Sequence, residues 1–100
     1  MIGAAASAAV LTPRAKAATV HDVAIRRLKF DPAHLRVRIG DAIRWTNYDL
    51  APHTATADEF GWDTEELARG EAAEVVVTRE METSYFCVFH PHMKGSLEID

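Results

Sequence analysis

Apolar and polar residues alternate one by one along several short segments of this chain. Leu35, Val37 and Ile39 are separated by charged side chains, and the segment ends at the turn residues Gly40 and Asp41. Successive side chains of a β-strand point to opposite faces, so this alternation predicts a strand with one buried and one solvent-facing side. Helices are hard to place after the first twenty residues, and strands are expected to dominate.

Further strands follow from the same alternation and from β-branched or aromatic composition. The segment from Ala42 to Asn47 is expected to pair with the strand before it. Three more strands are expected over residues 75–78, 84–88 and 96–99. The longest connection spans residues 57–70, where at most one helical turn is expected. Short strands at this spacing predict an all-β fold, a small Greek-key β-sandwich, formed by residues 18–100 as a single domain.

The first seventeen residues differ in composition from the rest. An apolar stretch from Ile2 to Leu11 is too short for a transmembrane helix, which needs about 20 residues. The tripeptide from Ala15 to Ala17 has the A-x-A form that signal peptidase cleaves. Residues 1–17 are therefore expected to be a signal peptide, either truncated or lacking a basic start, and the protein to be periplasmic. The alternative is an alanine-rich tail on a cytosolic protein.

Cysteine count and charge exclude several classes of protein. The single cysteine rules out a disulfide scaffold and any site with four thiolates from this chain. Fifteen acidic and eleven basic side chains give a net charge of −4, which argues against a nucleic-acid-binding module. The lone thiol therefore needs its own explanation.

A thiol, an imidazole and a thioether follow at three-residue steps in Cys87, His90 and Met93, where a strand gives way to a loop. Thiolate and thioether select soft metal ions, and a His₂Cys plane with a long axial Met is the arrangement of blue-copper sites. Another histidine, His53, lies in a loop after the 42–47 strand. Loops at one end of a sandwich cluster, so His53 can join the other three residues around one ion.

The same residues resemble those of the cupredoxins, and within that family the amicyanin-like and plastocyanin-like proteins. The resemblance covers nearly all of residues 18–100 and includes Phe30-Asp31-Pro32, Gly40-Asp41, Trp45-Thr46-Asn47, Asp49, Pro52-His53-Thr54, Tyr85-Phe86-Cys87, His90-Pro91, Met93 and Gly95. The two-residue spacings between Cys87, His90 and Met93 are similar to the short ligand loop of amicyanin. Val88-Phe89 stands where the family often has Thr-Pro.

The resemblance implies a cupredoxin-like fold with one type 1 copper ion per chain, which cycles between Cu(I) and Cu(II). Its strong ligands would be His53, Cys87 and His90, with Met93 as the weak axial ligand. Asn47 would hydrogen-bond toward the Cys87 region and tie the ligand loops together. The implied function is to shuttle single electrons, without enzymatic activity, between a periplasmic dehydrogenase or oxidase and a c-type cytochrome. The chain is expected to be a monomer.

Two other functions fit the same residues. A copper delivery or storage protein would use the same ligands but favour one oxidation state. A thiol enzyme would pair Cys87 with His53 or His90, but the sequence shows no oxyanion donors and leaves Met93 unexplained. The remaining residues singled out are the histidines His21, His34 and His92, expected at the surface, and the aromatic residues Phe30, Trp45 and Tyr85, expected in the core.

Overall fold

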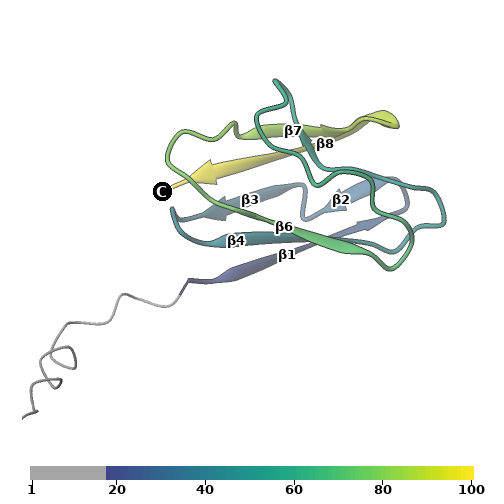
Figure 1. Ribbon diagram of the computed structural model, residues 1–100, viewed down its shortest axis with the longest axis horizontal. Helices are drawn as coiled ribbons and strands as arrows, with labels where there is room; N and C mark the ends of the chain where they lie inside the picture. Colours follow the sequence, from purple (N-terminus) through teal and green to yellow (C-terminus); the bar gives the residue numbers. More distant parts are fainter. Residues whose placement is uncertain (1–17) are drawn as a thin grey trace, which may run out of the picture.

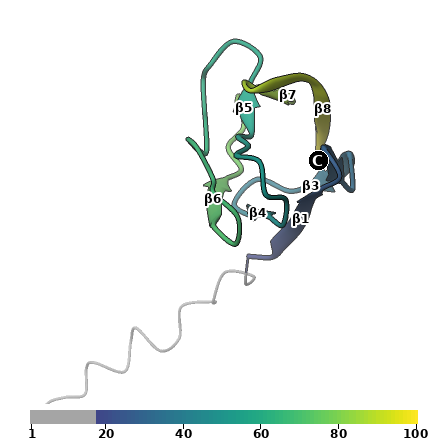
Figure 2. The same cartoon turned by 90° about the vertical axis from the view of Figure 1, so that its right-hand side faces the viewer.

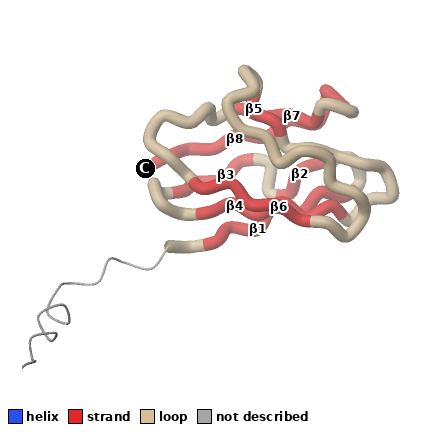
Figure 3. Tube along the Cα trace, in the orientation of Figure 1, coloured by secondary structure: helices blue, strands red, loops and turns tan. Residues whose placement is uncertain are grey.

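Two four-stranded sheets packed face to face make up residues 18–100, the part of the protein that the computed structural model describes (Figure 1). The predicted signal peptide, residues 1–17, lies outside the described residues. The strands are β1 (Val20–Arg26), β2 (Lys29–Asp31), β3 (His34–Val37), β4 (Ala42–Asn47), β5 (Thr56–Ala57), β6 (Ala72–Val76), β7 (Ser84–Cys87) and β8 (His90–Ile99). Residues 18–100 contain no helix, and so none that could span a membrane (Figure 3). The predicted all-β sandwich is confirmed.

From β2 to β7, successive strands alternate between the two sheets. One sheet has the order β2-β1-β4-β6 and the other β3-β8-β7-β5, and Figure 2 views both layers along the strands. Most neighbouring strands are antiparallel, but β1 pairs with β4, and β3 with β8, in parallel. Strands that are parallel neighbours cannot be joined by a tight turn, so the chain crosses between the sheets before it returns.

The expected pairing of the Ala42–Asn47 strand with the strand before it is wrong. Strand β3 pairs with β8 in one sheet, whereas β4 lies between β1 and β6 in the other. Strand β3 ends at Val37, two residues earlier than the alternation predicts, and Ile39 is 46% exposed. Gly40, with a φ of 96°, turns the chain out of one sheet and into the next. The alternation identified both strands and their buried faces, but not their neighbours.

The side chain of Asp41 stabilises this crossover through hydrogen bonds. Its carboxylate accepts hydrogen bonds from the N–H groups of Thr19 and Arg38, at 3.2 and 3.0 Å, and lies 2.8 Å from Nε2 of His21. The bond with His21, followed by that from Arg38, lowers the pKa of Asp41 to about 2. His21 is therefore a half-buried structural residue, and its prediction as a plain surface residue is wrong.

Aromatic side chains from both sheets form the centre of the core, as expected. Trp45 of β4 is fully buried, and its ring centroid lies 5.4 Å from that of Tyr85 of β7. Phe30 of β2 packs edge-on against Tyr85 at 4.8 Å, and Trp62 stacks on Trp45 at 5.4 Å. These contacts cross between the sheets, so the cluster holds together the two sheets from which the loops after Asn47 and Cys87 start.

Candidate metal centre

Cys87 and His90 face each other across a tight turn. Strand β7 ends at Cys87, β8 begins at His90, and only Val88 and Phe89 lie between them. The two residues are register partners in the β7–β8 hairpin, and an irregularity lies between Phe86 and Cys87. Such an irregularity re-aims a side chain at the end of a strand. As a result the Cys87 Sγ lies 3.6 Å from Nδ1 of His90.

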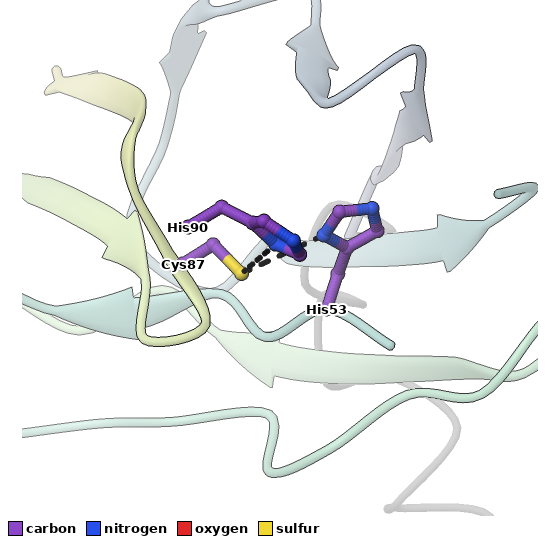
Figure 4. Close-up of side chains that lie close together, drawn as sticks. All are labelled: His53, Cys87 and His90. Atoms are coloured by element: carbon purple, nitrogen blue, oxygen red, sulfur yellow. Dashed lines mark hydrogen bonds between the residues drawn. The ribbon is translucent and has the colours of Figure 1, made fainter. Parts of the chain in front are cut away.

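His53 joins this pair from a loop distant in sequence. Its Nδ1 lies 3.6 Å from the Cys87 Sγ, and one ligand atom from each of the three residues lies within 4.8 Å of the others (Figure 4). His53 and Cys87 are fully buried, and His90 is half-buried. Two backbone hydrogen bonds between His53 and Leu67, of 3.2 and 2.8 Å, attach the His53 loop to the 57–70 connection. That connection consists of turns, bends and isolated β-bridges, and it contains no helix.

The structure places Met93 and His92 on opposite sides of β8. Met93 is 4% exposed and belongs to the same core cluster as Cys87. His92 is exposed, in agreement with its prediction as a solvent-facing residue. The alternation of side chains along a strand explains this difference between adjacent residues. A thioether is thus buried three residues beyond His90, whereas the imidazole of His92 points away from the core.

Thr54, rather than Asn47, ties the ligand loops together. The Thr54 N–H donates to the Cys87 Sγ at 3.4 Å, and the Thr54 hydroxyl accepts a hydrogen bond from the Val88 N–H at 3.0 Å. The Asn47 amide donates instead to the carbonyls of Ala51 and Leu67, each at 2.9 Å. The implied bond from Asn47 toward the Cys87 region is therefore wrong, because the Asn47 amide binds its own loop at Ala51 and the 57–70 connection at Leu67. No local pattern in the sequence points to this role of Thr54.

Asp49 is a second residue whose role sequence analysis missed. Its Oδ2 lies 2.8 Å from Nε2 of His53, on the side of the ring away from Cys87. It also accepts hydrogen bonds from the N–H groups of Arg27 and Leu28. Partial burial acts to raise the pKa of Asp49, but these backbone hydrogen bonds and the bond from His53 together lower it. The only signal in the sequence was a carboxylate four residues before a predicted ligand.

The donor set of this cluster fits copper. A thiolate with two imidazoles in one buried site suits a soft or borderline ion, and a nearby thioether is typical of copper rather than of calcium or magnesium sites. The thiol must lose its proton on metal binding, as a coordinating thiol does. The N–H of Thr54, aimed at the sulfur, stabilises the resulting negative charge.

A β-sandwich in which two histidines converge on a buried cysteine is typical of a cupredoxin. A sequence profile of the copper binding proteins of the plastocyanin/azurin family matches residues 17–100. The chain belongs to this family. It is a copper-binding electron-transfer protein of amicyanin-like type, as the resemblance implied.

Individual relatives agree with this assignment. Amicyanin-alpha of Methylorubrum extorquens is 26% identical over 84 residues, an alignment that covers 79% of this chain and 71% of the relative. Amicyanin of Paracoccus denitrificans is also 26% identical, over 78% of this chain but only 63% of its own length. The solved structure of a Cu(I) form of an amicyanin mutant has a TM-score of 0.70 and 27% identity, covering 87% of this chain and 86% of that one.

Proposed function

We propose that this protein carries single electrons between redox partners through one type 1 copper ion, held by His53, Cys87 and His90 with Met93 as the axial ligand. The convergence of His53 and His90 on the Cys87 sulfur, each at 3.6 Å, is the observation that carries the proposal. Copper supplies the one-electron chemistry when it is bound. The bonds of Thr54 and Leu67 hold the ligand loops, so the donors have little freedom to rearrange as the charge changes.

The two alternative functions agree less well with the site. Cys87 is fully buried, so a thiol enzyme would have no accessible nucleophile. A delivery protein needs ligands that a recipient can reach, whereas His53 is also fully buried. Only His90 is partly open to solvent, which leaves one edge of the site for an electron to cross.

An exposed apolar surface is proposed at that edge, formed by residues beside His90 and by residues of the loop that carries His53. It consists of Leu50, Pro52, Val88, Phe89 and Pro91, and we call it the docking patch. Leu50 is 82% exposed, Phe89 is 46% exposed and Val88 is 40% exposed. Weak redox encounters use small interfaces, of less than about 1,200 Å², and an apolar patch of this kind suits a partner that must also release. The patch is the proposed point of electron entry and exit.

A basic hairpin adjoins the docking patch and favours an acidic partner surface. Arg26, Arg27 and Lys29 are exposed at the β1–β2 turn, and Asp49 connects this turn to the loop that carries Leu50. Opposite charges at the rim of an interface speed association more than they raise affinity. A dehydrogenase or oxidase on one side and a c-type cytochrome on the other remain the proposed partners, with the protein acting as a monomer.

Export to the periplasm is part of the same proposal. The family match begins at residue 17, beside the A-x-A site that ends at Ala17. Cleavage there would release residues 18–100 as the single domain. Mass spectrometry of the protein recovered from a periplasmic fraction would test this, and a full-length chain in the cytosol would contradict it.

Voltammetry of the copper-loaded protein tests the function directly. Because the ligand frame is rigid, we expect a reversible one-electron wave with equal oxidation and reduction currents. The visible absorption spectrum of the sample should be the same before and after repeated cycles of oxidation and reduction. A protein that binds Cu(I) and releases copper on oxidation would instead be a delivery or storage protein.

Electron self-exchange between two copies tests the docking patch without a known partner. Leu50→Glu places like charges on both copies where the patches meet, so we expect the self-exchange rate constant, measured by NMR line broadening, to fall roughly tenfold at low salt. Added salt should restore part of the rate. Val76→Glu is the matched control, because Val76 is 60% exposed at the opposite end of the sandwich, paired with Ala42. Equal effects of the two variants would contradict the docking patch.

A further inference from the structure

We propose that Asp49 is a positioning residue that fixes the tautomer of His53 and favours Cu(II) over Cu(I) at the site. The proposal rests on the proposed role of His53 as a copper ligand. It assigns to the Asp49 carboxylate, and to the hairpin turn that holds it, an effect on the reduction potential of the site.

The two nitrogens of the buried His53 ring have different partners. Nε2 lies 2.8 Å from the Asp49 Oδ2, and Nδ1 lies 3.6 Å from the Cys87 Sγ. A carboxylate can only accept a hydrogen bond, so the proton of the neutral ring resides on Nε2. The lone pair of Nδ1 is then directed toward Cys87, where a metal ligand needs it. Asp49 therefore selects the ligating tautomer.

The β1–β2 turn holds the Asp49 carboxylate in place. Arg27 donates its N–H to Oδ1 at 2.7 Å, and Leu28 donates its N–H to Oδ2 at 3.0 Å. Both residues have positive φ, 56° and 61°, as a two-residue hairpin turn of type I′ requires. Left-handed backbone is unfavourable for residues other than glycine, and the two hydrogen bonds to Asp49 offset part of that cost.

Asp49 is also fixed from its own loop. Its N–H donates to the Asn47 Oδ1 at 2.8 Å, while the Asn47 amide binds the carbonyls of Ala51 and Leu67. The carboxylate is thus restrained by its backbone on one side and by two N–H donors on the other. Restraint of this kind makes Asp49 a fixed negative charge beside His53 rather than a mobile surface acid.

A fixed carboxylate beside Nε2 of His53 changes the basicity of Nδ1, the nitrogen that faces Cys87. Carboxylate partners orient a ligating imidazole and raise its basicity, and their loss typically weakens metal binding by about 10–100-fold. The negative charge stabilises the more positive ion more strongly, so Cu(II) gains more than Cu(I) from Asp49. Removing the charge should therefore raise the reduction potential.

The first arm of the test uses copper-free protein, so it does not depend on the metal. Long-range proton–nitrogen NMR correlations should show His53 protonated on Nε2, with slow exchange of that proton. In Asp49→Asn the exchange should be at least tenfold faster. Asp58→Asn removes the same charge from an exposed loop and should leave His53 unchanged. A native His53 protonated on Nδ1 would overturn the proposal.

The second arm measures the reduction potential of the copper-loaded variants. We expect Asp49→Asn to weaken Cu(II) binding about tenfold relative to Cu(I), which corresponds to a rise of about 59 mV in potential. Asp58→Asn should shift it far less. A purely structural Asp49 would lower the melting temperature but leave the potential equal to that of the native protein, which would overturn the proposal. Failure of His53→Ala to affect copper binding would instead contradict the proposed ligand set.

Discussion

Replacing Cys87 with serine should abolish the intense visible absorption of the copper-loaded protein. That absorption arises from charge transfer between a thiolate and Cu(II), and Cys87 is the only cysteine in the chain. A serine hydroxyl at the same buried position has no thiolate to supply it. Cu(II) bound to the remaining histidines should give only the weak absorption of ordinary Cu(II) sites. The measurement is a visible spectrum after addition of one equivalent of Cu(II).

Met93→Ala is the matched comparison for this prediction. A weak axial ligand tunes a thiolate site without creating it, so this variant should keep an intense band at a shifted position. Circular dichroism of both copper-free variants checks that each still folds. If the native protein were colourless with Cu(II), or Cys87→Ser kept the intense band, the proposed type 1 site would be wrong.

Short-range patterns in the sequence carried most of what could be predicted. Cys87, His90 and Met93 are close in sequence, so their spacing alone placed soft donors at one strand end. The buried Ile43 and Trp45 alternate with partly exposed neighbours in β4, as a half-buried strand requires. Local spacing was sufficient for these residues because each pattern lies within one short segment of the chain.

Strand pairing was beyond the reach of the same patterns. Alternation states which face of a strand is buried, but many partners can satisfy one buried face. The segments on either side of Gly40 look like a hairpin in sequence. In the structure, the chain crosses to the other sheet at this point, and Asp41 stabilises the crossover through its three hydrogen-bonding partners. That outcome depends on Thr19 and His21, which are about twenty residues away.

The residues around the ligands show the same limit. Thr54 contacts the Cys87 sulfur across 33 positions of sequence, and Asp49 meets a hairpin turn more than 20 residues earlier. Neither contact leaves a local pattern. A family resemblance supplied a role for Asn47 instead, and the structure gives that role to Thr54. Such contacts become visible only when the loops are packed together.

Truncation of Trp45 to alanine should cause the largest loss of stability among substitutions outside the metal centre. Its side chain is fully buried and contacts aromatic rings from Tyr85 and Trp62. Removing a buried tryptophan costs about 3–5 kcal/mol of unfolding free energy through lost burial and the cavity left behind. In a domain of this size, 1 kcal/mol shifts the melting temperature by about 4–8 °C. We therefore expect the melting temperature of the copper-free protein to fall by more than about 12 °C.

Two milder variants separate packing from hydrogen bonding in this cluster. Within residues 18–100 the Trp45 Nε1 has no hydrogen-bond partner, whereas the Trp62 Nε1 donates to the Glu82 carbonyl at 2.9 Å. Trp45→Phe therefore loses ring volume but no hydrogen bond, and Trp62→Phe also loses a bond worth about 0.5–1.5 kcal/mol.

Because Trp45 is far more deeply buried, Trp45→Ala should still exceed Trp62→Ala in cost. Chemical denaturation measures all four, with Val76→Ala on the exposed edge as a control within about 0.5 kcal/mol of the native protein. Near-native stability of Trp45→Ala would contradict the view that this ring joins the two sheets.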